Sequence, residues 1–163
     1  MEIRIVPYAE NYRDTVITLL LMLQQTLVDI DPEHVQILSE SYKSNYLDYV
    51  IALTKRSNGT MLVAIQNDSV VGFAAGYIEE KDEEDHLSNR CPKRGRVSEL
   101  IVEDAVRHCN IGTMLLRKME NIFKEQGCEF IAIDVFAPNL GALDFYYGNG
   151  YQNRNIEIYK KLL

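Results

Sequence analysis

The sequence predicts one α/β domain, in which a mixed sheet carries helices on both faces. Its 163 residues, 47% of them hydrophobic, suffice for one sizeable core. Segments with the two-residue period of strands are interspersed along the chain with segments of helical period. In the middle of the chain, residues 96–126 read as a buried strand, a tight turn and an amphipathic helix. We therefore expect a single domain over residues 1–163.

The first half of the chain is expected to form a strand, two helices and a hairpin. In order, these are a strand over residues 3–6, helices over 11–28 and 39–55, and strands over 61–66 and 69–78. Pro7 ends the first strand, and Ser39 is placed to cap the second helix. The turn-forming pair Asn67-Asp68 joins the hairpin. Small residues at 72 and 74–76 indicate that a helix packs closely against the last of these strands.

The central unit predicts an anion site. A strand over residues 96–102, rich in β-branched and apolar residues, leads into a turn and an apolar-striped helix over 114–126. Ile111, Leu115, Met119 and Phe123 recur at steps of four, and Gly127 ends the helix. The first N–H groups of a helix have no partner within it and lie at its positive end. The turn therefore offers donors to a phosphate, and Gly112 allows close approach.

The C-terminal part is expected to complete the sheet. Residues 130–136 form a buried strand, and a short helix runs from the cap Asn139 to Tyr147, where Gly148 and Gly150 end it. Residues 155–160 alternate apolar and polar side chains, which predicts a last strand that closes the sheet.

The turn carries a recognisable motif. After Val102 the sequence reads Arg107-His108-Cys109-Asn110-Ile111-Gly112, which lacks the glycines of a Rossmann turn and the Gly-Lys-Ser/Thr of a P-loop. It resembles the acetyl-CoA motif of the GNAT superfamily of N-acetyltransferases, Arg/Gln-x-x-Gly-x-Gly/Ala, about five residues beyond a strand-ending valine. Asn110 replaces the first glycine, and asparagine tolerates a positive φ. Downstream, Asn139 to Tyr151 resembles a second family block, Asn-x-x-Ala-x-x-Phe/Leu-Tyr-x-x-x-Gly-Phe/Tyr.

The resemblance, which covers residues 60–163, implies a fold and a reaction. The fold is the GNAT acyl-CoA N-acyltransferase fold, whose mostly antiparallel sheet splays apart at the CoA site. The reaction moves an acetyl group from acetyl-CoA, as co-substrate, to a primary amine of a small-molecule or protein acceptor by direct attack. The implied CoA contacts are Leu100, Ile101, Val102, Arg107, His108, Cys109, Asn110, Ile111, Gly112, Thr113, Asn139, Ala142 and Tyr146.

The resemblance also implies two catalytic residues. Glu99, the only carboxylate inside the central strand, matches the position of a general base. Tyr146 matches the tyrosine that protonates the departing CoA sulfur. Each has an alternative: Glu99 facing solvent beside Arg96 or binding a structural partner, and Tyr146 serving as a packing residue while Tyr147 takes the role.

Two other kinds of protein fit the same patterns. A catalytically inactive, CoA-binding regulatory domain of the same fold would keep the turn and lack a working base. A structural module without a ligand would explain the helices and strands but not the paired motifs. The tyrosines of the second helix, Tyr42, Tyr46 and Tyr49, are interpreted as packing residues with wet hydroxyls. The resemblance places that helix along the acceptor pocket.

Charge and cysteine content constrain the partners. A net charge of −7 argues against a nucleic-acid binder, which normally needs a basic surface. Residues 79–85 hold six acids and one lysine, either as a solvated loop or as a flap that concentrates a cationic amine, so we expect a cationic acceptor. Cys91, Cys109 and Cys128 follow no metal-ligand spacing, which predicts free thiols and no metal. With no apolar run long enough to span a membrane and no signal peptide, we expect a cytoplasmic protein, with a homodimer left open.

Overall fold

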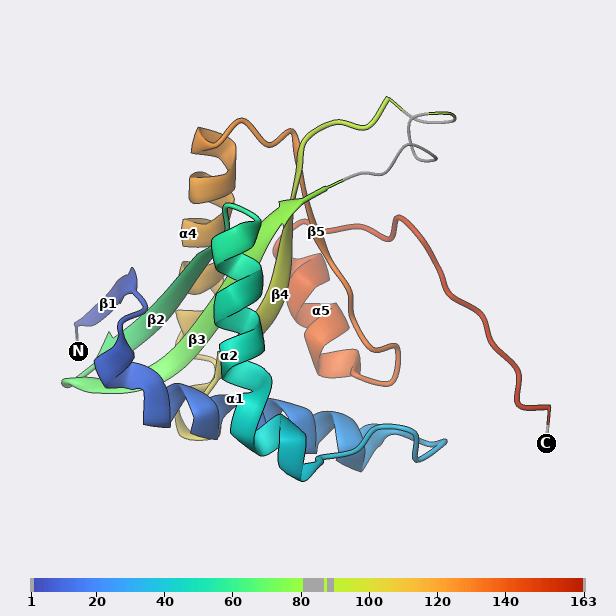
Figure 1. The fold of residues 1–163 in the computed structure, drawn as a ribbon, viewed down its shortest axis with the longest axis horizontal. Helices are drawn as coiled ribbons and strands as arrows, with labels where there is room; N and C mark the ends of the chain where they lie inside the picture. The colour runs from blue at the N-terminus through green and yellow to red at the C-terminus, as the bar shows by residue number, and fades with distance from the viewer. Residues whose placement is uncertain (1, 81–86, 88–89, 163) are drawn as a thin grey trace.

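The core of the protein is a five-stranded sheet with the order β1-β2-β3-β4-β5 (Figure 1). The computed structural model describes residues 2–80, 87 and 90–162. The strands are β1 (Ile3–Pro7), β2 (Thr60–Gln66), β3 (Ser69–Glu79), β4 (Arg94–Val102) and β5 (Phe130–Ile133). Neighbours from β1 to β4 are antiparallel, and β5 is parallel to β4. The predicted mixed, mostly antiparallel sheet is confirmed.

Helices cover both faces of the sheet, as predicted. They are α1 (Arg13–Ile30), α2 (Glu40–Arg56), α4 (Ile111–Glu125) and α5 (Leu140–Gly148), with short 3-10 turns η1 (Glu10–Tyr12) and η2 (Asp104–Val106). α1 and α2 pack on one face, in a cluster centred on Phe73. α4 packs on the other face, in a second cluster that includes Leu115 and Phe123. Phe145 and Tyr146 of α5 lie against this second cluster. No helix of the described residues is long and apolar enough to cross a membrane.

Local signals in the sequence act where they were expected. The Ser39 side chain caps α2 by accepting a hydrogen bond from the Tyr42 N–H at 3.1 Å. Asn67 and Asp68 both have positive φ, 49° and 60°, the conformation of a two-residue hairpin turn. Gly127 follows α4 with φ 81°. A side chain at Gly76 would come within 2.7 Å of Met119 in α4, so the small residues of β3 do admit a closely packed helix.

The prediction of a last strand over residues 155–160 is wrong. These residues carry no strand or helix, and the chain beyond Tyr151 runs away from the body of the protein (Figure 1). Ile156 and Ile158 are 75% and 89% exposed. Alternation shows that a segment can pair as a strand, but it does not say where a partner lies, and among the described residues none of β1 to β5 pairs with it.

The strand predicted over residues 130–136 is shorter and less buried than expected. β5 ends at Ile133, and Phe130 is half exposed. The reason is the position of β5 at the edge of the sheet, where, among the residues that the structure describes, it pairs only with the first four residues of β4.

Candidate active site

The site lies where β4 and β5 separate. β5 pairs with β4 only from Arg94 to Val97, whereas β3 continues to pair with β4 as far as Val102. The pairing of β3 with β4 passes from Gly76–Val97 to Ala75–Glu99, so Ser98 is an extra residue that forms a β-bulge. A bulge bends its strand and increases the local twist. The predicted splay therefore begins at Ser98.

The bulge also changes which face of the sheet the side chains meet. Before it, Gly95 and Val97 lie against α4. After it, Ile101 belongs to the core under α1 and α2, while Leu100 and Val102 lie on the α4 side. A regular strand would put residues 97 and 101 on the same face. Because the bulge shifts the alternation by one residue, Arg96 and Glu99 both line one pocket beside α2.

Glu99 is buried and bound to a tyrosine of α2. Glu99 is only 6% exposed, and its Oε1 atom accepts a hydrogen bond from the Tyr46 hydroxyl at 2.7 Å. Burial raises the pKa of the Glu99 carboxyl to about 7, although the bond from Tyr46 acts to lower it. The alternative in which Glu99 faces solvent is therefore wrong. A carboxyl that titrates near neutral pH is suited to accept a proton.

A polar pocket opens beside Glu99. It is a cavity of about 210 Å³ lined by Tyr46, Tyr49, Val50, Leu53, Tyr77, Arg96, Val97, Ser98, Glu99 and Asp134. Tyr46 stacks between Tyr42 and Tyr49, with ring centroids 4.2 and 6.0 Å apart. Stacking fixes the Tyr46 ring and so directs its hydroxyl toward Glu99. The interpretation of Tyr46 as a packing residue is confirmed, but the expectation of a wet hydroxyl is wrong, because helical spacing gives no information about a partner on β4.

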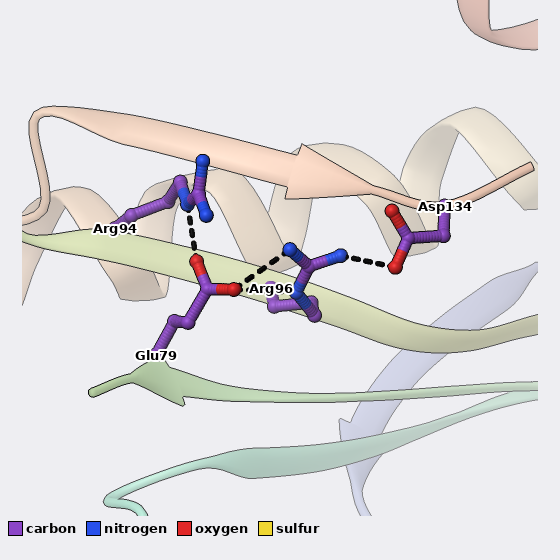
Figure 2. A network of polar contacts seen from close by, with 4 residues as sticks. All are labelled: Glu79, Arg94, Arg96 and Asp134. Carbon is purple, nitrogen blue, oxygen red and sulfur yellow. Dashed lines mark hydrogen bonds and ion pairs between the residues drawn. The ribbon is translucent and has the colours of Figure 1, made fainter. Parts of the chain in front are cut away.

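Charged side chains at the start of β4 form a network next to this pocket (Figure 2). Glu79, at the end of β3, accepts hydrogen bonds from Arg94 and from Arg96, the latter at 2.7 and 3.1 Å. Arg96 also donates to Asp134, the residue that follows β5 in the chain. Burial by itself would raise the pKa of Glu79, but the bonds from the two arginines outweigh it and lower that pKa. The network joins β3, β4 and the end of β5 on the α2 side.

The predicted acidic flap is only partly described. Glu79 belongs to β3 and to the network above, so it is not part of a solvated loop. Glu80 is exposed. The remaining acids of the run, within residues 81–85, lie outside the described residues.

The predicted phosphate turn has the expected backbone. Asn110 is the N-cap of α4 with φ 64° and ψ 8°, the left-handed conformation that the glycine of the motif would adopt without strain. His108 also has a positive φ of 65°. The Met114 N–H donates to the Asn110 carbonyl as the first bond of the helix, so the N–H groups of Ile111, Gly112 and Thr113 precede it. Arg107, His108, Cys109 and Asn110 are exposed.

Gly112 and the end of β4 connect the turn to the splay. A side chain at Gly112 would come within 3.2 Å of the Phe145 ring and 3.8 Å of Val102. The missing side chain thus lets α4 approach α5, a packing role in addition to the predicted approach to an anion. Arg107 contacts Asp104 at 2.6 Å and donates to the Val102 carbonyl at 3.4 Å, and these bonds hold the turn against the strand.

The second motif block forms the start and body of α5. The Asn139 side chain caps this helix, its Oδ1 accepting from the Ala142 N–H at 3.1 Å. Tyr146 packs against Phe145 and Tyr151. Burial raises the pKa of Tyr146, and the negative charge of Glu99 raises it further. Tyr147 instead is 45% exposed, with its hydroxyl on Asn153 at 2.9 Å. The charge of Glu99 thus acts on the buried Tyr146 hydroxyl, whereas the Tyr147 hydroxyl bonds to Asn153 at the surface.

Tyr46 and Asp134 are pocket residues that the sequence motifs do not indicate. Helical spacing predicts only packing for Tyr46, and the pairing of β5 with β4 that places Asp134 beside the pocket is not visible in the sequence. All three predicted free cysteines are unpaired thiols. In the described part of the chain, no group of three or more His, Cys, Asp or Glu side chains is placed to hold a metal ion.

Comparisons with known proteins identify the family and the fold. A model of the acetyltransferase (GNAT) family matches residues 23–151. An uncharacterized N-acetyltransferase of Methanocaldococcus jannaschii is 36% identical over 119 residues, 72% of this chain and 69% of that protein. A putative acetyl transferase from Pyrococcus furiosus superimposes with a TM-score of 0.76 at 23% identity, covering 99% and 100% of the two chains. Glucosamine-6-phosphate N-acetyltransferase from Arabidopsis thaliana does so with a TM-score of 0.69 at 16% identity over 99% of each chain.

The strand, turn and helix at the site, the splayed sheet and the family match define an acyltransferase that uses acetyl-CoA as co-substrate. The chain belongs to the GNAT family of acetyltransferases.

Proposed function

We propose that the protein transfers the acetyl group of acetyl-CoA to a primary amine by direct attack. The amine nitrogen bonds to the thioester carbonyl carbon, and the carbon–sulfur bond breaks. Glu99 takes the proton that the ammonium must lose before attack. Tyr146 supplies one to the departing thiolate, and this is balanced by the second proton that the nitrogen releases as the amide forms. The observation that carries the proposal is the buried Glu99 carboxyl in the wall of a polar pocket, with a pKa of about 7. At neutral pH such a group holds enough of its basic form to accept a proton and enough acidic form to release it.

The open edge of β4 supports a seat for the CoA arm. From Ser98 to Val102 this edge has lost β5, so the backbone groups of Leu100, Ile101 and Val102 are available to pair with an extended ligand. At the end of the same strand, the N–H groups from Ile111 to Thr113 and the positive end of α4 suit a pyrophosphate. The cap and turn residues would contact CoA through their backbone atoms. The remaining proposed CoA contacts are Arg107, His108, Cys109, Asn110, Gly112, Asn139 and Ala142.

Charges in the pocket favour a cationic acceptor. Glu99 contributes a carboxylate to the pocket, the charge of Arg96 is balanced by Glu79 and Asp134, and the rings of Tyr46, Tyr49 and Tyr77 line part of the wall. Aromatic faces attract ammonium groups, and carboxylates pair with them. The alternative of a regulatory domain without a working base is less well supported, because a titratable carboxylate sits in the pocket.

Acetyl-CoA and a broad panel of acceptors test this proposal. We expect CoA release with polyamines, aminoglycosides or lysine-like amines, and none with alcohols or anionic amines. Initial rates at varied concentrations of both substrates should intersect, as for direct transfer, and exposed Cys109→Ala should keep full activity. Parallel, ping-pong lines would contradict direct attack. Higher salt should lower kcat/KM, because exposed charges are screened. Calorimetric CoA binding without release on any acceptor would favour the regulatory domain.

A further inference from the structure

Helix α5, which carries Tyr146, is only lightly packed. None of its nine residues is fully buried, whereas α4 buries several side chains against the sheet, among them Leu116 and Phe123. A side chain that takes part in catalysis must be held in a narrow range of positions, and a lightly packed helix does not do this by itself. Contacts around α5 therefore have to fix the position of Tyr146.

The chain folds back on Tyr146 at the end of α5. Gly150 has φ 89°, the left-handed conformation. The Gly150 N–H donates to the Tyr147 carbonyl at 3.0 Å, and the next N–H, of Tyr151, donates to the Tyr146 carbonyl at 3.1 Å. These two bonds form a Schellman motif, in which the residue after the glycine packs against the residue whose carbonyl it binds. The rings of Tyr151 and Tyr146 do so, with centroids 5.7 Å apart.

Tyr151 also joins α5 to α4. Its hydroxyl donates to the Oε1 atom of Glu120 at 3.0 Å, in a partly buried setting. In the described part of the chain, this is the one hydrogen bond that links residues 140–151 to the sheet or to another helix. Hydrogen bonds to a carboxylate are stronger than those between neutral groups. Tyr151 thus connects the lightly packed helix to one that is anchored on the sheet.

The Tyr146 hydroxyl itself is not used in the structure. Among the described residues, no hydrogen bond joins it to another group. Every fully enclosed side-chain nitrogen or oxygen of these residues has a partner, so the Tyr146 oxygen is not sealed in the core. Its ring is held between Phe145 and Tyr151, with centroids 5.1 and 5.7 Å away. A hydroxyl without a partner on a fixed ring is suited to meet a substrate atom.

We propose that Tyr151 and Glu120 are positioning residues for acetyl transfer, which hold the Tyr146 ring so that its hydroxyl meets the departing thiolate. The inference rests on the proposed role of Tyr146 as proton donor. Tyr151 acts through its ring contact with Tyr146, and Glu120 acts through the Tyr151 hydroxyl, so neither touches the substrate. Without the bond, the Tyr151 ring can shift, and the Tyr146 ring shifts with it. A displacement of about 1 Å can cost about a hundredfold in rate.

Kinetics of Tyr151→Phe and Tyr146→Phe, separately and combined, test the proposal. Tyr151→Phe keeps the ring and the backbone bonds but loses the bond to Glu120, so kcat with a confirmed acceptor should fall about tenfold. CoA affinity, measured by calorimetry, should stay close to wild type. In a chain that already carries Tyr146→Phe, adding Tyr151→Phe should lower kcat no further, because the group that it positions is gone. A purely structural role would give the same loss in both chains.

Glu120 provides an independent arm of the test. Glu120→Ala should match Tyr151→Phe, and Glu120→Gln, which keeps an acceptor oxygen, should restore most of kcat. Exposed Glu125→Gln on the same helix is the control and should leave kcat unchanged. Thermal melts show whether each variant is folded.

Two results separate this inference from the proposed reaction. If Tyr146→Phe is impaired but Tyr151→Phe keeps full kcat, or if the two losses multiply in the combined variant, the positioning role alone is overturned. If Tyr146→Phe keeps full kcat, Tyr146 is not the proton donor and the positioning role falls with it.

Discussion

Both halves of β4 pair with β3 along one edge, but only the first half pairs with β5 along the other edge. From Arg94 to Val97 the strand is paired on both edges, and its arginines are tied to Glu79 and Asp134. From Ser98 to Val102 the strand keeps β3 but loses β5, and Glu99 is buried next to Tyr46. One half resists separation of the strands and the other is open to a ligand.

The difference shows how an edge is opened inside a sheet without unfolding it. The pairing with β5 ends next to the bulge at Ser98, and the ion-pair network of Glu79, Arg94, Arg96 and Asp134 lies directly before it (Figure 2). Changes in the open half should therefore affect acetyl transfer, and changes in the paired half should affect stability. The following variants test that division.

Glu99→Gln should have the largest effect. It keeps the shape of the side chain and a bond to Tyr46 but removes the proton acceptor, so kcat with a confirmed acceptor should fall about a thousandfold. CoA affinity, measured by calorimetry, should stay close to wild type. Glu103→Gln, an exposed carboxylate just past β4, is the control and should leave kcat unchanged. Equal losses in both variants would remove Glu99 from its proposed role.

Tyr146→Phe should lower kcat about a hundredfold, because it removes only the oxygen that protonates the thiolate. Ring packing against Phe145 and Tyr151 is retained. Tyr147→Phe is the control, since its hydroxyl bonds to Asn153 on the surface. A loss in the control with none in Tyr146→Phe would assign the role to the neighbour. No loss in either would mean that the thiolate takes its proton from water.

Glu79→Gln should destabilise the paired half by about 1–2 kcal/mol, because it leaves Arg94 and Arg96 without their shared carboxylate in a mostly buried setting. The lowered pKa of Glu79 means that its stabilising effect is present above the unfolded pKa and is lost as the pH falls through the folded pKa. Denaturant unfolding near neutral pH and at acidic pH measures both effects. Exposed Glu80→Gln should leave stability unchanged.

The pH profile should report the Glu99–Tyr46 bond. For wild type, kcat/KM should rise with pH through a value near 7 as Glu99 loses its proton. Tyr46→Phe removes a bond that lowers this pKa, so the rise in kcat/KM should move to higher pH and activity at pH 7 should fall severalfold. If kcat/KM of Tyr46→Phe rises at the same pH as that of wild type, the proposed role of this bond is contradicted.

The same carboxyl should make stability depend on pH. Because the folded state binds this proton more tightly than the unfolded chain, stability should decrease as the pH rises from about 4.5 to about 7. That decrease should disappear in Glu99→Gln.

The smallest effects are expected at the turn that follows the open half. Asn110→Gly relieves a left-handed conformation and should change stability by a few tenths of a kcal/mol, with CoA affinity equal or better. Asn110→Val puts a β-branched residue in the same conformation and should cost about 1 kcal/mol of stability and weaken CoA binding. Thermal melts and CoA titrations compare the pair. Equal behaviour of the two variants would mean that φ at this residue does not matter.

Residues that act through local geometry could be predicted from the sequence. The hairpin at Asn67-Asp68, the caps Ser39 and Asn139 and the turn at Asn110 depend on short-range bonds or on the φ values that a residue tolerates. The order of helices and strands followed from periodicity. The family motifs indicated Glu99 and Tyr146 by their place in the chain.

Tertiary structure alone decided which side chains meet. Regular alternation would separate Arg96 from Glu99, and only a bulge that depends on pairing with β3 brings both to the pocket. Tyr46 reaches Glu99 across 53 residues of sequence, and the pKa of Glu99 results from the burial that this contact completes. Residues 155–160 are a second example of what the sequence does not determine. Their period predicts a strand, but pairing needs a neighbouring edge, and the position of that edge is a property of the folded chain or of two chains together.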